Sequence, residues 1–160
     1  MLKRKWLLLA IPFWVLFVIV SVGFSAEGKK MLMAAEKIIL TPDELQWKEG
    51  PLALPYAKIA VLEGDPNKRG FFVMRIKLPA GTKIPTHVHK NIERVTVISG
   101  KFNLAMGDKP ENPSVLPAGS YFSFPPKTVH NAWVDEETVL QISTTGPWTF
   151  KPIKKEAKKD

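Results

Sequence analysis

The sequence predicts an all-β protein, a small antiparallel barrel or sandwich that follows a short helical turn. From residue 56 onward, short runs rich in Val, Ile, Phe and Thr alternate with Gly-, Pro- and Asn-containing segments at intervals of about ten residues, which is typical of strands joined by turns. About eight such runs cannot cover their apolar faces in one open sheet, so they must close into a barrel or stack. With 160 residues and 45% hydrophobic content, the chain is expected to form one compact core.

The helical turn is expected first, in the stretch TPDELQW. Thr41 is a suitable N-cap, Pro42 suits the first helical position, and Glu44 completes a capping box. The strands that follow are separated by turn segments such as GDPN, PAGT, SGK and PAGS. The expected strands cover residues 56–62, 71–78, 86–89, 94–100, 101–106, 121–124, 128–134 and 138–144.

Residues 1–25 are predicted to be a signal peptide or a membrane anchor. Three basic residues open the chain, and no charged residue lies between Lys5 and Glu27. The apolar stretch 6–24 is longer than the ~7–15 residues of a usual signal core and close to the ~20 that span a bilayer. Cleavage near Ala26 and retention as an inner-membrane anchor therefore both stay open. Either form predicts a periplasmic or secreted location for the rest of the chain.

The charge distribution argues against nucleic-acid binding. The formal charge of +8 is concentrated at the two ends, and residues 6–150 carry 15 basic and 13 acidic side chains with no basic stripe. Residues 26–50 are predicted to form a linker and N-terminal segment, residues 51–150 the barrel, and residues 151–160 a basic disordered tail. Membrane contact is expected only through the N-terminal segment. The absence of cysteine excludes disulfides, thiolate metal sites and a cysteine nucleophile.

The histidines are candidate metal ligands, and the competing interpretation is that each is an ordinary barrel or surface residue. His87 and His89 are two residues apart on a predicted strand, so both side chains should project from the same face. Glu93 lies an even number of residues away and can return to that face, and His130 belongs to the predicted strand 128–134. Three imidazole nitrogens and one carboxylate oxygen suit one divalent transition metal, which could be Fe, Mn, Ni, Cu or Zn.

These residues resemble the two sequence motifs of the cupin family. The first motif, G-x5-H-x-H-x3-E-x6-G, is filled by Gly81, His87, His89, Glu93 and Gly100. The second is similar to the stretch that contains Gly119, Pro125 and His130. It departs from the family at Lys127, where cupins have glycine, and at Val134, where they have asparagine. The resemblance covers residues 56–146 and implies a double-stranded β-helix, or jelly-roll, barrel with a metal held by His87, His89, Glu93 and His130.

The resemblance does not decide the function, because cupins include dioxygenases, isomerases, decarboxylases, storage proteins and sensors. If the metal takes all three histidines, Glu93 is the remaining candidate for proton transfer and hence the candidate catalytic residue. The favoured hypothesis is a metal-dependent small-molecule enzyme, a dioxygenase-like oxidoreductase. The alternative is a non-catalytic module that binds a ligand or a metal for sensing or scavenging.

Five further residues carry weaker expectations. Arg75 and Gln141 interrupt apolar strands and are candidates to contact a substrate inside the barrel, although an outward-facing position is the competing interpretation for Arg75. Trp133 should face away from His130. Together with Trp47 and Trp148, it is expected to pack under the N-terminal segment or at a homodimer contact.

Overall fold

The computed structural model describes residues 37–50, 54 and 56–153. The described part contains one 3₁₀ turn, η1, and β-strands joined by loops. The elements are η1 (Pro42–Glu44), β1 (Lys48–Glu49), β2 (Lys58–Glu63), β3 (Gly70–Leu78), β4 (Lys83–Val88), β5 (Glu93–Ser99), β6 (Lys101–Met106), β7 (Ser114–Pro117), β8 (Tyr121–Phe124), β9 (His130–Trp133), β10 (Thr138–Gly146) and β11 (Lys151–Pro152). The predicted signal or anchor, residues 1–25, and the tail residues 154–160 lie outside the described residues.

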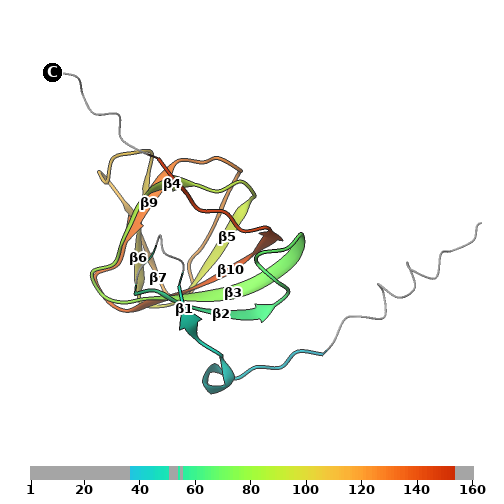
Figure 1. Ribbon diagram of the computed structural model, residues 1–160. Helices are drawn as coiled ribbons and strands as arrows, with labels where there is room; N and C mark the ends of the chain where they lie inside the picture. The colour runs from blue at the N-terminus through green and yellow to red at the C-terminus, as the bar shows by residue number, and fades with distance from the viewer. Residues whose placement is uncertain (1–36, 51–53, 55, 154–160) are drawn as a thin grey trace, which may run out of the picture. The chain divides into compact units, whose positions relative to one another are not determined.

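The strands form two antiparallel sheets that face each other across the core (Figure 1). A six-stranded sheet has the order β1-β2-β3-β10-β5-β8, and a five-stranded sheet has the order β11-β4-β9-β6-β7. The chain crosses repeatedly from one sheet to the other, so neighbours in a sheet are mostly distant in sequence. This is the jelly-roll arrangement, and it confirms the all-β prediction and the short N-terminal turn.

Every second side chain along a strand points into the core. On β3 the inward side chains are buried and the alternate ones are partly exposed. The buried set on this strand is Phe72, Met74, Ile76 and Leu78. Burying each such side chain contributes about 1.5–3 kcal/mol. On the neighbouring β10, Leu140 and Ile142 face the same core, because they pair with Ile76 and Met74.

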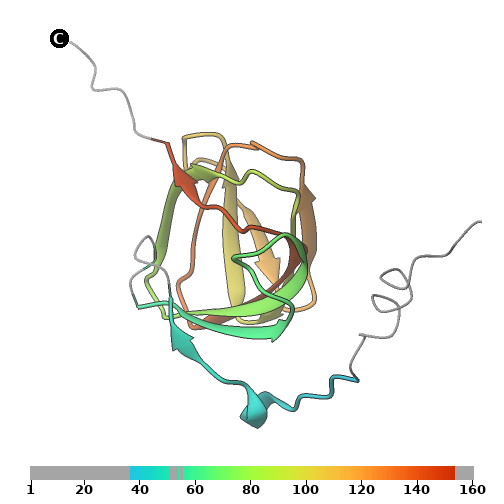
Figure 2. The same cartoon turned by 45° about the vertical axis from the view of Figure 1, so that its right-hand side comes forward.

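All eight expected strands are present, and three short strands were not predicted: β1, β7 and β11. β11 has the largest consequence. Lys151 pairs with Val88 and Pro152 pairs with His87, so the sheet continues beyond the predicted barrel boundary at residue 150. Figure 2 shows β11 running beside β4. A strand of only two residues is too short to show hydrophobic alternation in the sequence.

Two turns show how the motif residues act in the fold. Gly100 has φ +76°, and a Cβ there would lie 2.5 Å from the carbonyl oxygen of Glu137 and from Oγ1 of Thr138. Lys127, which replaces a family glycine, also adopts the left-handed region at φ +66° and donates its N–H to the carbonyl of His89 at 2.8 Å. The turn before His130 therefore keeps a glycine-like conformation in spite of the substitution. Val134, which replaces the family asparagine, is 1% exposed and packs in the core.

Among the described residues, no helix has the length and apolar character needed to cross a membrane.

Candidate metal centre

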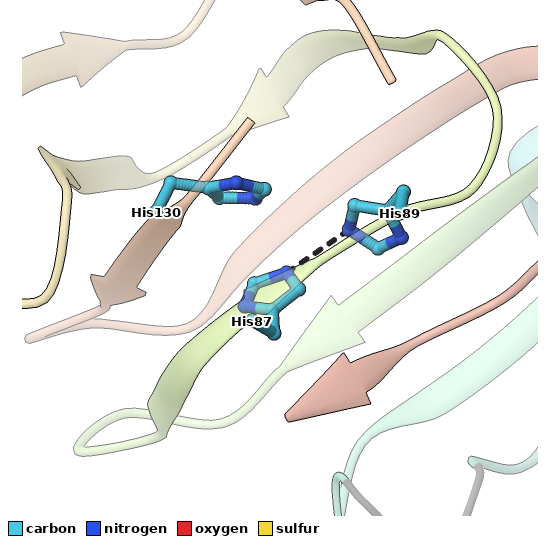
Figure 3. A group of neighbouring side chains, drawn as sticks. All are labelled: His87, His89 and His130. Atoms are coloured by element: carbon cyan, nitrogen blue, oxygen red, sulfur yellow. Dashed lines mark hydrogen bonds between the residues drawn. The ribbon is translucent and has the colours of Figure 1, made fainter. Parts of the chain in front are cut away.

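The three histidines meet where β4, β9 and the loop after β4 come together (Figure 3). β4 and β9 pair antiparallel, and a register irregularity between Ile84 and His87 sets His87 directly opposite His130. His89 follows the end of β4 and turns back toward the same point. Figure 3 shows the three rings directed toward one another, with His87 and His89 in contact.

The cluster is compact and buried. One ligand atom from each of His87, His89 and His130 lies within 4.8 Å of the others, a spacing that could hold a metal ion. The three residues are 3–4% exposed, so bulk water does not solvate them. The Nε2 atoms of His87 and His89 are 3.0 Å apart.

Backbone carbonyls fix the proton on the outer nitrogen of each ring. Nδ1 of His87 lies 2.7 Å from the carbonyl oxygen of Pro85, and Nδ1 of His130 lies 3.0 Å from that of Thr128. Nδ1 of His89 lies 2.5 Å from the carbonyl oxygen of Thr149. A carbonyl oxygen can only accept, so each neutral ring carries its proton on Nδ1 and presents the Nε2 lone pair to the cluster. The 3.0 Å contact between two Nε2 atoms therefore sets two lone pairs against each other.

A proton on one ring would relieve this repulsion, but burial disfavours the charged form. Burial lowers the pKa of His87 to about 3, and the imidazoles of His130 and His89 act in the same direction, whereas the Pro85 carbonyl opposes them. Burial also lowers the pKa of His89, against the Glu93 carboxylate and the Thr149 carbonyl, which raise it. Near neutral pH the rings of His87 and His89 therefore stay neutral, which is the form that binds a metal.

Glu93, the first residue of β5, brings a carboxylate to the same place. Its Oε1 is 3.4 Å from Nε2 of His89, and its Oε2 is 3.2 Å from Nε2 of His130. Oε2 is buried and has no hydrogen-bond partner. In the tautomer that carries its proton on Nδ1, His130 has no proton on Nε2, and in that form the 3.2 Å contact is not a hydrogen bond. Three converging lone pairs and a partnerless carboxylate oxygen form a donor set that fits a divalent cation.

Aromatic side chains close the cluster on the side of the C-terminal strand. Trp148 stacks on His89 with ring centroids 4.2 Å apart, and Phe150 stacks on His87 at 4.3 Å. The cavity that the histidines, Glu93 and these aromatics enclose has a volume of about 40 Å³. Trp148 was expected under the N-terminal segment or at a dimer contact. No local pattern reveals its position, because it depends on the path of the chain after β10.

Arg75 and Gln141 do not reach the cavity. They face each other in the β3–β10 pairing on the side of the sheet opposite to the core, and Nε of Arg75 donates to Oε1 of Gln141 at 3.2 Å. Strand alternation explains this, since their neighbours Met74, Ile76 and Ile142 point inward. The structure therefore gives no reason to retain either residue as a substrate ligand at the histidine cluster.

A family model described as "Domain of unknown function (DUF4437)" matches residues 30–151, which is most of the chain. The chain belongs to this family. No curated protein matched the sequence. The matched region of this DUF4437 member includes all three histidines, Glu93 and both stacking aromatics.

Similar solved structures establish the fold as that of the cupins. An RmlC-like cupin protein from Ralstonia eutropha JMP134 is 23% identical, covers 72% of each chain and has a TM-score of 0.55. A putative acetylacetone dioxygenase from Methylibium petroleiphilum PM1 is 20% identical over 74% of this chain and 87% of its own, with a TM-score of 0.58. The polyketide cyclase RemF from Streptomyces resistomycificus is 11% identical over 76% and 88%, with a TM-score of 0.62. This DUF4437 member thus has the cupin fold, and its histidine cluster could hold a metal.

Proposed function

We propose that this cupin is a metal-dependent enzyme of the oxygenase type that acts on a small molecule. The observation that carries the proposal is the donor set: three Nε2 lone pairs converge, their protons are held away by backbone carbonyls, and a buried carboxylate oxygen has no partner. His87, His89 and His130 would hold the metal, with Glu93 as a fourth ligand. A bound transition metal supplies Lewis acidity and, for redox-active ions, access to dioxygen chemistry.

The protein's own residues would supply proton transfer and the exclusion of water. Glu93 is the carboxylate at the cluster, and its Oε2 has no other partner, so it is placed to accept a proton from a substrate atom there. The surrounding wall is apolar, with Val95, Leu140 and Ile142 among its members. Such surroundings keep water from competing for the donors and strengthen electrostatic interactions at the site.

The direct test is the metal content of the purified chain. We expect about one transition-metal ion per chain by elemental analysis, and loss of that ion in His87→Ala and His130→Ala. Asn131→Ala is the matched control, because Asn131 follows His130 on β9 and is also buried, yet bonds to the carbonyl of Gly107 instead of joining the cluster. Equal, negligible metal in the wild type and both histidine variants would refute the proposal.

Glu93→Gln separates an enzyme from a binding module. The amide keeps the size and one acceptor oxygen but removes the charge and the basicity, so the three imidazoles should still retain metal when metal is in excess. For an enzyme, turnover should then fall by roughly 10²–10⁴, the range for loss of a general acid or base. A binding module would keep nearly wild-type ligand affinity. Likeness to a putative acetylacetone dioxygenase makes oxygen uptake with acetylacetone the first assay to try.

We also propose that the protein is exported, on the basis of the basic start and the apolar stretch 6–24. In a bacterial host, added protease should reach the domain once the outer membrane alone has been permeabilised. Mass spectrometry of the N-terminus then distinguishes a chain cleaved near Ala26 from one that keeps its anchor. Recovery of the intact chain as soluble cytoplasmic protein would contradict both forms.

A further inference from the structure

Two side chains near the C-terminus form a partition between two hollows of the molecule. Trp148 and Phe150 line the histidine cavity of about 40 Å³, and they also line a separate cleft of about 510 Å³. Leu54 and Ile76 likewise contribute to both. The two hollows are therefore separated by the thickness of a few side chains.

The two hollows differ in what they can hold. A volume of about 40 Å³ admits a few water-sized groups, since one water needs roughly 10–15 Å³ on the same measure. An organic substrate does not fit there with the partition closed. The outer cleft, at about 510 Å³, lies within the range of roughly 300–1,000 Å³ that is usual for small-molecule sites.

The lining of the outer cleft indicates the kind of molecule it would accept. Ile59, Met74 and Ile76 make an apolar wall, and the aromatic rings of Trp148 and Phe150 complete it. Glu49 and Asn67 add polar groups. The described residues that line the cleft include no basic side chain, so nothing in the lining would compensate an anionic ligand. A neutral, largely apolar molecule with one donor atom for the metal fits best.

The backbone of the partition is anchored, so its side chains are the parts that can move. Residues 147–153, the C-terminal strap, are held from several sides. Trp148 N–H donates to the Pro66 carbonyl at 2.6 Å, and Ile153 N–H donates to the Thr86 carbonyl at 2.8 Å. Thr149 Oγ1 accepts from the Lys90 N–H at 2.8 Å. Trp148 and Phe150 are only partly buried, so rotation of their rings would join the two hollows while the strap stays in place.

We infer that the outer cleft is the substrate-binding vestibule of the histidine site, for neutral and largely apolar molecules, and that Trp148 and Phe150 limit the size of what reaches the histidines. The inference rests on the proposed metal-dependent function. In this arrangement a substrate binds with its apolar body in the cleft. Its donor atom would pass the rotated rings to reach a metal held by the three histidines.

Two neutral probes of different size test the inference on the purified full chain. Imidazole and 4-phenylimidazole bind metals through the same nitrogen and differ by one phenyl ring. Their association with the Co²⁺-loaded protein is followed by visible absorption in the wild type, Trp148→Ala, Phe150→Ala and the control Trp133→Ala. Trp133 is also partly buried, but it lies on the outward face of β9 and lines neither hollow. In the metal-free protein, the ¹³C-labelled methyl of Met74, assigned by Met74→Leu, reports occupancy of the cleft.

We expect 4-phenylimidazole to shift the Met74 methyl resonance without metal. Its association with cobalt should be about tenfold faster in Trp148→Ala and Phe150→Ala than in the wild type and Trp133→Ala, because the slow step that opens the partition is removed. The rates for imidazole should change much less. An unmoved Met74 resonance with equal association rates in all four proteins would refute the proposal that the cleft is a vestibule. Normal cobalt uptake in those proteins would still support the metal site. A Met74 shift in a protein that takes up no cobalt would overturn the metal-dependent function and the route to the histidines.

Discussion

Acid should destabilise the metal-free protein through His87, by an amount that follows from its burial. The unfolded chain binds a proton near the ordinary histidine pKa of 6.5, whereas the folded chain binds it only near 3. Between these values the unfolded state holds more protons, so the free energy of unfolding rises with pH and is lost on acidification. The slope in this window is about 1.4 kcal/mol per pH unit. On going from about pH 7.5 to about pH 5, His87 should therefore cost the fold about 2 kcal/mol.

Urea denaturation in the presence of a chelator measures this loss. The wild type is compared with His87→Gln, which cannot titrate at that position but keeps a polar side chain of similar size. The free energy of unfolding of the wild type should fall by about 2 kcal/mol more than that of the variant over this pH interval. His89 is present in both proteins, so its own contribution cancels to first order. Parallel pH dependences of the two proteins would show that His87 is not desolvated as the structure indicates.

Four other measurements follow from single contacts. Saturating metal should raise the free energy of unfolding of the wild type by about 2.7 kcal/mol at one hundred times the dissociation constant, and a thermal melt that metal does not shift would argue against a site in the folded state. Gly100→Ala should destabilise by about 2–5 kcal/mol, from a left-handed φ and the 2.5 Å contacts of the new Cβ, as read from urea midpoints. Lys127→Gly should stabilise by about 0.5–1 kcal/mol, because it relieves the left-handed lysine at the cost of some chain entropy, and no gain would mean that the turn is unstrained. Asn91→Ala should cost about 1 kcal/mol by loss of the hydrogen bonds to the carbonyls of Thr145 and Pro147, and should also speed metal release to a chelator.

The fold could be predicted because its evidence is local. Strand alternation along residues 71–78 and the regular turn segments define which residues face inward, and burial on β3 follows that alternation. The pairing of strands was harder to predict from the sequence. β3 lies beside β10 and β5 lies beside β8, and such long-range neighbours leave no trace in one sequence beyond the family resemblance. Short edge strands such as β7 and β11 contain too few residues to show a period.

Only part of the candidate site could be predicted from the sequence, for the same reason. Spacing placed His87 and His89 on one face, and the resemblance suggested His130 and Glu93 as their companions. The structure brings these four residues together. Arg75 and Gln141 lie on the outer face of the sheet, as strand alternation requires, and so they do not reach the site. Trp148 and Phe150 were missed as parts of the site. Their position depends on the strap crossing from β10 to β4, a tertiary feature with no sequence period.

The three histidines also differ in how their orientation is secured, and this difference links the strap to the metal site. His87 and His130 each donate Nδ1–H to the carbonyl two residues earlier, so their own strands orient them. His89 donates instead to Thr149, which lies 60 residues away on the strap. Trp148 stacks on this same ring, so docking of the strap both orients His89 and covers it.

Outer contacts of this kind fix the tautomer and raise the basicity of a metal ligand. A loosened strap should therefore weaken the hold of His89 on a metal while His87 and His130 remain in place, and it would uncover the cavity from the side of the outer cleft. The strap is thus a structural part of the metal centre, and a domain that ended at β10 would lack the group that orients one of the three histidines.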